Sequence, residues 1–219
     1  MTDRRRERLR EAAYRRQLNL TVVLENVHDQ HNIGAVLRSC DAVGIAEIYV
    51  LHNEVGIQHK NLTLGKRTSA GTRRWVDVHY FTDTDACFDK IRTRYDRVYA
   101  THMAEDAVGL YELDLTEAVA LVFGNEHDGI SQPALDRCDG NFLVPQMGMV
   151  QSLNISVACA VTVYEAFRQR SAKDFYGDGN PASAADREAL FQEYMERHEA
   201  RVVRKKIPPS PDDPRGLLS

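Results

Sequence analysis

Residues 21–51 read TVVLENVHDQHNIGAVLRSCDAVGIAEIYVL, and they predict a strand, a helix and a second strand in succession. The β-branched run TVVLENV (21–27) is typical of a buried strand. Residues 33–43 keep apolar side chains at helical spacing and are followed by Gly44, a residue that commonly ends helices. EIYVL (47–51) predicts the second strand. Two strands joined through a helix favour parallel pairing.

The same alternation continues over residues 20–171. Further strands are predicted at WVDVHYF (75–81), RVYATHM (97–103), VALVFGN (119–125) and NFLVP (141–145). Further helices are predicted at 84–94, 132–138 and 153–170. Strands that alternate with helices predict an α/β fold, with a mostly parallel sheet and helices on both of its faces.

Composition places the chain among ordinary globular proteins. Of its 219 residues, 43% are hydrophobic and 27% are charged, and the net charge of −4 by itself gives no indication of a nucleic-acid partner. Four cysteines without a C-x-x-C pair argue against a disulfide framework or a zinc ribbon, so no metal is expected. No apolar stretch approaches the roughly 20 residues that span a membrane, and no secretory signal is visible. We expect a cytoplasmic protein without membrane association.

The two ends of the chain differ from its middle. Residues 1–19 form a basic helical extension, residues 20–171 the main domain, and residues 172–219 a linker, a charged helix and a Pro-rich tail. Positive charge is concentrated at the two ends. The candidate RNA-binding residues are Arg4, Arg5, Arg6, Arg8, Arg10, Arg15, Arg16, Arg204, Lys205 and Lys206. A solvated helix face is the alternative interpretation.

Polar motifs follow the predicted strands, where ligands bind in open parallel sheets. In ENVHDQHNIGAVLRSCDAVG, Asn32 can cap a helix, and Arg38 is either a surface residue or a group that binds phosphate or polarises an RNA hydroxyl. In LVFGNEHDGIS, Glu126 can orient an arginine, whereas a polar turn accounts for His127 and Asp128.

A third motif, VPQMGMVQSLNISVACAVTVYEAFRQR, begins at the last predicted strand. Ser152 can serve as a helix N-cap, and Asn154 is a poor helix former with no evident local role. The small residues of the helix that follows are explained by packing. The chain has no G-x-G-x-x-G, P-loop or G-x-S-x-G motif, which leaves dinucleotide-binding, P-loop and hydrolase interpretations without support.

In their order and spacing, these three motifs resemble the SpoU/TrmH family of RNA ribose 2′-O-methyltransferases, within the SPOUT superfamily, over roughly residues 14–171. The GMVQSLN phrase and the basic first helix favour the members that methylate guanosine 18 in the D-loop of tRNA. The resemblance implies a C-terminal trefoil knot, a homodimer, and S-adenosylmethionine held in loops. The implied cofactor-binding residues are Thr101, Met103, Gly124, Val144 and Leu153.

The resemblance also implies roles in catalysis. Arg38 would position the attacking 2′-oxygen and Glu126 would orient Arg38, while Asn32, Ser152 and Asn154 would hold the loop, the ribose and the phosphate. Two alternatives stay open. One is a sister enzyme that methylates ribosomal RNA or another tRNA position, and the other is a knotted RNA-binding protein without catalysis.

Overall fold

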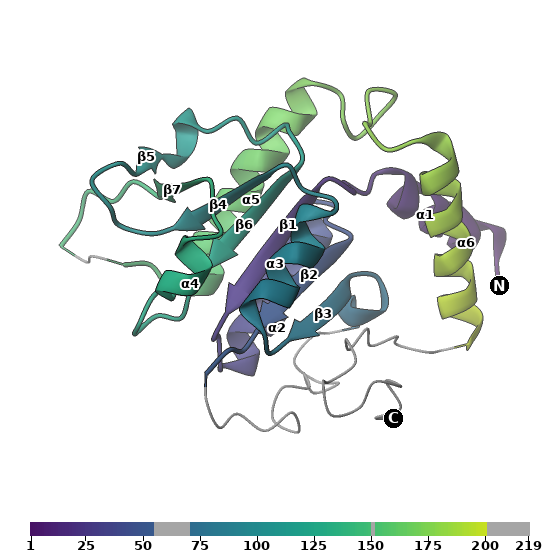
Figure 1. Ribbon diagram of the computed structural model, residues 1–219. Helices are drawn as coiled ribbons and strands as arrows, with labels where there is room; N and C mark the ends of the chain where they lie inside the picture. Colours follow the sequence, from purple (N-terminus) through teal and green to yellow (C-terminus); the bar gives the residue numbers. More distant parts are fainter. Residues whose placement is uncertain (55–70, 150–151, 201–219) are drawn as a thin grey trace.

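The computed structural model describes residues 1–54, 71–149 and 152–200. Its centre is a parallel sheet of seven strands in the order β3-β2-β1-β6-β4-β7-β5 (Figure 1). The strands are β1 (Leu20–Glu25), β2 (Glu47–Leu51), β3 (Asp77–Phe81), β4 (Arg97–Thr101), β5 (Val108–Gly109), β6 (Val119–Phe123) and β7 (Gly140–Leu143). The prediction of an α/β fold with a parallel sheet is confirmed.

Helices cover both faces of this sheet. One face packs against α2 (Gln30–Ala42) and α5 (Ile155–Ala172), and the other against α3 (Thr84–Arg92) and α4 (Gln132–Leu135). Each strand supplies both apolar layers because successive side chains point to opposite faces. In β1, for example, Val22 and Leu24 belong to the first layer and Val23 to the second. Two short 3₁₀ helices, η2 (Thr72–Arg74) and η3 (Leu110–Glu112), lie in the connections between strands.

The start of α2 differs from the prediction. The helix begins at Gln30, because the side chain of Asp29 accepts a hydrogen bond from the backbone N–H of His31 over 2.8 Å and so acts as the N-cap. Asn32 therefore lies inside the first turn and is not the cap. Its side chain is free to turn toward another part of the chain. The predicted end is confirmed, since Gly44 follows the helix with φ +85°.

The start of α5 also differs. The sequence suggested Ser152 as the N-cap, but Asn154 takes that position and accepts a hydrogen bond from the backbone N–H of Ser156 over 2.9 Å. Its amide group remains available for other partners. Ser152 lies outside the helix, with its side chain exposed.

Two helices close to the ends of the chain pack against each other beside the sheet. Helix α1 (Asp3–Tyr14) contacts α6 (Ala184–Ala200) through a small buried cluster of Leu9, Ala13, Phe191 and Tyr194 (Figure 1). The pair docks at the amino ends of the strands: Arg197 of α6 binds Asp77, the first residue of β3, over 2.8 Å. The segment predicted as a linker is attached to the core, since Tyr176 donates to the carbonyl of Val43 and Asn180 to that of Arg16.

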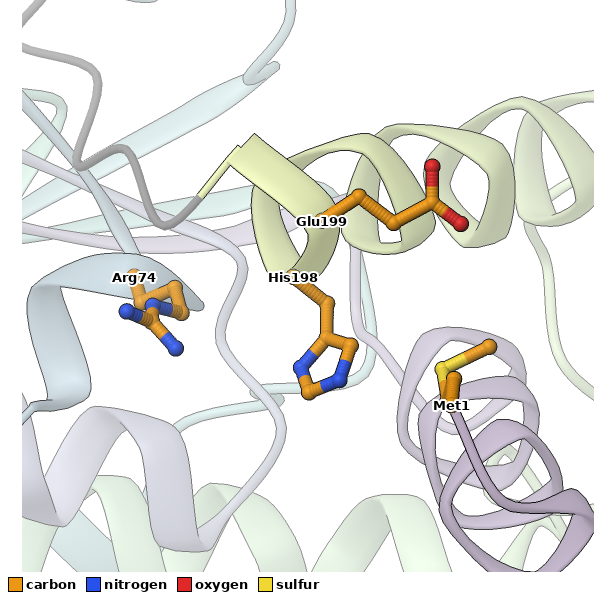
Figure 2. Close-up of a pocket in the computed structure, with 4 residues that line it drawn as sticks. All are labelled: Met1, Arg74, His198 and Glu199. Carbon is orange, nitrogen blue, oxygen red and sulfur yellow. The ribbon is translucent and has the colours of Figure 1, made fainter.

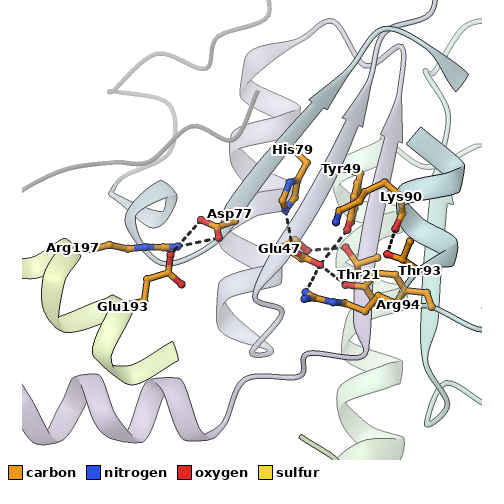
Figure 3. Close-up of polar contacts among 11 residues, drawn as sticks. Thr21, Glu47, Tyr49, Asp77, His79, Lys90, Thr93, Arg94, Glu193 and Arg197 are labelled. Carbon is orange, nitrogen blue, oxygen red and sulfur yellow. Dashed lines mark hydrogen bonds and ion pairs between the residues drawn. The ribbon is translucent and has the colours of Figure 1, made fainter. Parts of the chain in front are cut away.

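A buried carboxylate also stands at this amino edge. Glu47, the first residue of β2, accepts hydrogen bonds from His79 (2.8 Å), Arg94 (2.8 Å), Tyr95 (2.9 Å) and Tyr49 (3.2 Å) (Figure 3). Burial alone would raise the pKa of Glu47. The hydrogen bond and charge of His79 and the charge of Arg94 outweigh this effect and lower the pKa to about 2. The cluster is a structural ion pair far along the strands from the site described next.

Candidate active site

A cavity of about 390 Å³ lies at the carboxyl ends of β4, β6 and β7. Thr101 and Met103 reach it from the end of β4, Gly124 from β6, Val144 from β7, and Leu153 from the segment before α5. These are the five cofactor-binding residues that the family resemblance implies, and the structure brings all of them to one cavity. Parallel strands place their carboxyl ends together, which is why the motifs meet there.

The cavity wall is largely apolar with a few polar groups. Phe123 and Phe142 pack edge to face, with ring centroids 6.3 Å apart, beside Leu143 and Ile155. His102 and Gln146 also line the cavity and are not among the predicted site residues. His102 lies in the last residues of a predicted strand and Gln146 directly follows another, so the rule of strand ends could have found them. The volume lies within the range of roughly 300–1,000 Å³ for small-molecule sites.

A second cavity, of about 360 Å³, lies at the other end of the sheet between the N-terminus, η2 and the end of α6 (Figure 2). Its lining consists of Met1, Arg74, His198 and Glu199. None of the residues that the sequence predicts for catalysis or cofactor binding is among them. The cavity at the carboxyl ends is therefore the candidate active site.

A tight turn after β6 shapes the first cavity. A Cβ atom on Gly124 would lie 2.1 Å from the carbonyl oxygen of Gly129, so only glycine fits the first position. Gly129 itself has φ +71°. Within the turn, the Asn125 side chain accepts hydrogen bonds from the backbone N–H groups of His127 and Asp128, each over 2.7 Å. His127 and Asp128 thus lie in a polar turn, as the sequence analysis expects, and Glu126 projects from it.

Glu126 joins three segments that are far apart in the chain. Its Oε1 atom accepts hydrogen bonds from the side-chain amides of Asn32 (2.9 Å) and Asn154 (3.0 Å), and from the backbone N–H of Ile155 (3.4 Å). Asn154 also donates to Oδ1 of Asn32 over 3.2 Å. We call Asn32, Glu126 and Asn154 the carboxamide cluster. It links α2, the β6 turn and the start of α5 beside the cavity, which Glu126 and Ser152 also line.

Arg38 makes no hydrogen bond or ion pair with the carboxamide cluster of its own chain. It is exposed on α2, six residues after Asn32, and no hydrogen bond or ion pair joins it to another residue within 1–54, 71–149 and 152–200. The predicted contact between Glu126 and Arg38 is therefore not made inside a single chain. The carboxylate that was expected to orient Arg38 instead binds the two asparagine amides.

The comparisons with known proteins agree with this geometry. A model of the SpoU rRNA Methylase family matches residues 19–164, more than half of the chain. The chain belongs to this SpoU family. The tRNA (guanosine(18)-2′-O)-methyltransferase of Thermus thermophilus is 43% identical over 175 residues, which cover 80% of this chain and 88% of that protein.

Solved structures of SpoU family enzymes are also similar to this chain. The crystal structure of the A. aeolicus TrmH/SpoU tRNA modifying enzyme matches this SpoU family chain with a TM-score of 0.78 and 31% identity, covering 90% of this chain and 97% of that one. The SpoU methyltransferase AviRb from Streptomyces viridochromogenes, solved in complex with the cofactor AdoMet, matches with a TM-score of 0.62 and 25% identity, covering 72% of this chain and 60% of that one.

Some arginines near the start of the chain are exposed without a partner among the described residues, and others contact neighbouring side chains. Arg4, Arg8 and Arg15 are exposed, and their spacing of four and seven residues places them along one face of α1. No hydrogen bond or ion pair joins their side chains to another described residue. Arg6 is exposed as well. Arg5 lies over the ring of Trp75, and Arg10 lies over the ring of Phe191 and pairs with Glu188.

Arg16 is the main departure from the predicted RNA-binding set. Its side chain is only 4% exposed, and it donates to Asp41 (2.5 Å), to Tyr194 (2.8 Å) and to the carbonyl of Ile45 (2.9 Å). These bonds tie α1 to α2 and α6 and leave no free face for a phosphate. The expectation that Arg16 contacts RNA is corrected accordingly. Arg204, Lys205 and Lys206 lie outside the described residues.

Two further expectations concern absences. Within the described ranges, no group of three or more His, Cys, Asp or Glu side chains is arranged to hold a metal ion. No helix in that part of the chain is both long and apolar enough to cross a membrane.

Proposed function

We propose that this chain transfers a methyl group from S-adenosylmethionine to the ribose 2′-hydroxyl of guanosine 18 in tRNA. The carboxamide cluster supports this most directly, because it places residues of all three motifs beside the cavity at the carboxyl ends of the strands. The 43% identical T. thermophilus relative carries the name of this activity.

The cavity suits S-adenosylmethionine. Phe142, Leu143 and Leu153 offer apolar surface for the adenosine, and the loops after β4, β6 and β7 present backbone groups for its polar atoms. When bound, the cofactor supplies a methyl group on a positively charged sulfur. A site for this chemistry needs no metal, and its main task is to align the attacking oxygen with that methyl group. Good alignment alone contributes roughly 7–11 kcal/mol.

In this proposal Arg38 holds the 2′-oxygen and the neighbouring phosphate. A guanidinium group is a poor base but binds phosphate oxygens in pairs, so Arg38 acts chiefly by positioning. Glu126 fixes the amides of Asn32 and Asn154, which in turn hold the ribose and the start of α5. Ser152, exposed at the cavity, contributes a hydroxyl for the phosphate.

The proposal includes a homodimer that forms through α5. Val157, Tyr164 and Phe167 on this helix are 47%, 51% and 37% exposed, an apolar stripe that a second copy would cover. Because α2 packs beside α5, a partner on this face would bring its Arg38 close to the cavity. Met147 and Met149, between β7 and α5, are 97% and 99% exposed and are further apolar side chains that a partner could cover.

The knot, the domain division and the location are also parts of the proposal. The position of β7 beyond β4 in the sheet and the packing of α5 back against α2 support the proposed trefoil knot. Residues 20–171 would form the methyltransferase domain, with 1–19 and 172–219 as extensions. The four cysteines are free thiols, in keeping with the reducing cytoplasm.

Arg4, Arg8 and Arg15 form the proposed tRNA surface of α1. They lie at the amino ends of the strands, whereas the cavity lies at the carboxyl ends, and strands of five or six residues span roughly 17–20 Å. A bound tRNA would therefore contact this face and the cavity at once, or would reach the cavity of the partner subunit.

The test is to map the methylated ribose. The purified protein is incubated with S-adenosylmethionine labelled in its methyl group and an unmodified tRNA transcript, which is then digested with nucleases. We expect one labelled nucleotide, 2′-O-methylguanosine at position 18. A matched transcript with deoxyguanosine at position 18 should take up no label.

Other outcomes would replace the proposal. Label at another tRNA ribose, or only in ribosomal RNA, would assign the chain to a sister enzyme. Binding of tRNA without any transfer would leave an RNA-binding protein.

A further inference from the structure

The proposed reaction leaves a buried carboxylate beside the site without a role. Glu25 is the last residue of β1 and is 0% exposed. Its Oε2 accepts the backbone N–H of Ser131 over 2.9 Å, and its Oε1 accepts the hydroxyl of Ser131 over 2.5 Å. The side-chain amide of Asn53 donates to Oε1 over 2.8 Å. Among the described residues its hydrogen-bond partners are neutral, and a buried carboxylate without a charged partner is costly to keep, which calls for an explanation.

Asn53 extends the contacts of Glu25 to neighbouring elements. It also donates to Oγ1 of Thr84, the first residue of α3, over 2.9 Å, and it accepts a hydrogen bond from Asn26 over 2.6 Å. The ends of β1 and β2 and the start of α3 are thus joined to Ser131 through one carboxylate. This makes the position of Ser131 rigid relative to the sheet.

Ser131 gives up a local bond to make this link. It is the N-cap residue of α4, yet its side chain makes no capping hydrogen bond to that helix. A serine at this position commonly accepts from the backbone of its own helix. Its hydroxyl donates to Glu25 instead, 106 residues away in the chain. The hydrogen bond between Ser131 and Glu25 therefore has a role other than capping α4.

The link fixes the far end of the turn that carries Glu126. The near end continues from β6, and paired backbone hydrogen bonds between Asn125 and Gly129, each 3.1 Å long, join the two ends of the turn. The far end is also held by the apolar packing of Ile130, and the two bonds from Ser131 to Glu25 add a polar anchor one residue later. Glu126 accepts the hydrogen bonds that form the carboxamide cluster. The geometry of the cluster therefore depends on the bond between Ser131 and Glu25, which helps to position the turn.

We infer that Glu25 is a positioning residue that sets the Glu126 turn through Ser131, and thereby aligns the carboxamide cluster for methyl transfer. The inference rests on the proposed function, since alignment matters only if the cavity carries out that reaction. Glu25 is not one of the residues that line the cavity, and its effect passes through Ser131 and the turn.

Glu47 provides a matched control within the same sheet. It too is a buried glutamate on a central strand, with four hydrogen-bond partners, but it stands at the amino edge (Figure 3). Replacing either glutamate with glutamine removes a buried charge that the fold has satisfied. Only the change at Glu25 should disturb the turn.

The kinetic test compares Glu25→Gln with Glu47→Gln at a temperature where both are folded. We expect both to lower the melting temperature, but only Glu25→Gln to lower kcat, by at least tenfold, with KM for tRNA within threefold of the original. Ser131→Ala should lower kcat as well, and Ser131→Thr, which keeps the hydroxyl, should restore it to within threefold. A kcat for Glu25→Gln within twofold of the original would overturn the inference.

Amide hydrogen exchange gives a second measurement that does not depend on activity. In Glu25→Gln, the amides of Asn125–Gly129 should exchange at least tenfold faster, whereas in Glu47→Gln they should not change. Unchanged exchange in Glu25→Gln would overturn the inference. If Glu25→Gln fails to fold, Ser131→Ala takes its place in both tests. Absence of methyl transfer by the original protein would refute the proposed function. The amide hydrogen exchange measurement would still test whether Glu25 positions the turn.

Discussion

The side-chain amide of Asn154 donates a hydrogen bond to the Glu126 carboxylate over 3.0 Å, beside the cavity at the strand ends. Asn154 is also the N-cap of α5, so the same residue begins the helix and contacts the β6 turn. The amide of Asn32 reaches the same carboxylate oxygen over 2.9 Å from α2. Glu126 therefore holds together elements that no backbone pairing connects.

Glu126→Ala should lower kcat by about 100-fold, because a displacement of about 1 Å at a reacting centre has an effect of that size. Both asparagine amides would lose their common acceptor. The measurement is single-turnover methyl transfer with saturating tRNA, and Glu105→Ala is the control, since that glutamate is exposed and is not one of the residues that line the cavity. Equal rates for Glu126→Ala and the original protein would show that the cluster does not align the site.

Arg38→Ala should lower methyl transfer by about 100-fold to 1,000-fold, the effect of removing one donor from a reacting centre. Its exposed position outside the cavity lining predicts that the affinity for S-adenosylmethionine stays within threefold. Arg38→Lys keeps the charge but loses the paired donors, and we expect only partial activity. Transfer rates and calorimetric cofactor titration measure the two effects. Full activity of Arg38→Ala would end its assignment.

Replacing Arg4, Arg8 and Arg15 together with alanine should weaken tRNA binding and flatten its salt dependence. Each phosphate contact adds about 0.7–0.9 to the slope of log K against log salt, so three lost contacts should reduce the slope by about 2 to 3. Filter binding at several salt concentrations measures this slope. Arg137→Ala is the control, because that residue pairs with Asp85 and Asp89 on the surface of α3. An unchanged slope would contradict the proposed RNA surface.

Arg16→Ala should destabilise the fold by about 3 kcal/mol, the lower end for removing one partner of a buried ion pair, because Asp41 is 35% exposed. Arg15→Ala, one residue earlier and exposed, should change stability by less than about 0.5 kcal/mol. Urea unfolding measures both. Equal stabilities of the two variants would show that the buried hydrogen bonds of Arg16 contribute little.

Much of the fold could be predicted because each strand carries its own pattern. The bounds of β2, residues 47–51, are the same in the prediction and the structure. Errors fell where polar residues set the boundaries. Asp29 and Asn154 begin helices through single side-chain hydrogen bonds, which the apolar pattern does not record. Strand β5 has only two residues, too few for any pattern to show.

The predicted cofactor residues meet at one cavity because parallel strands bring their carboxyl ends together, a rule that needs no coordinates. Contacts between distant segments could not be found in the same way. The bond between Ser131 and Glu25 spans 106 residues, and neither motif indicates the other as its partner. Arg15 and Arg16 are identical in type and adjacent, so only the packing of α2 and α6 decides that Arg16 turns inward.

The Glu47 cluster predicts how stability depends on pH. The pKa of Glu47 in the folded protein is about 2, below its ordinary value of 4.5, because the charges and hydrogen bonds of His79 and Arg94 outweigh burial. A carboxyl group with a lowered folded pKa stabilises the fold above its unfolded pKa. This contribution, about 3 kcal/mol at about 1.4 kcal/mol per pKa unit, should therefore be complete above about pH 5 and be lost as the pH falls toward 2.

Glu47→Gln removes the titrating group and isolates this effect. The stability difference between the original protein and Glu47→Gln should shrink steadily as the pH falls from about 5 to 2, because all other carboxyl groups are common to both. Urea unfolding at several pH values measures the difference. A difference that stays constant over that range would mean that Glu47 titrates as it does in the unfolded chain, and that its four hydrogen bonds do not favour the charged form.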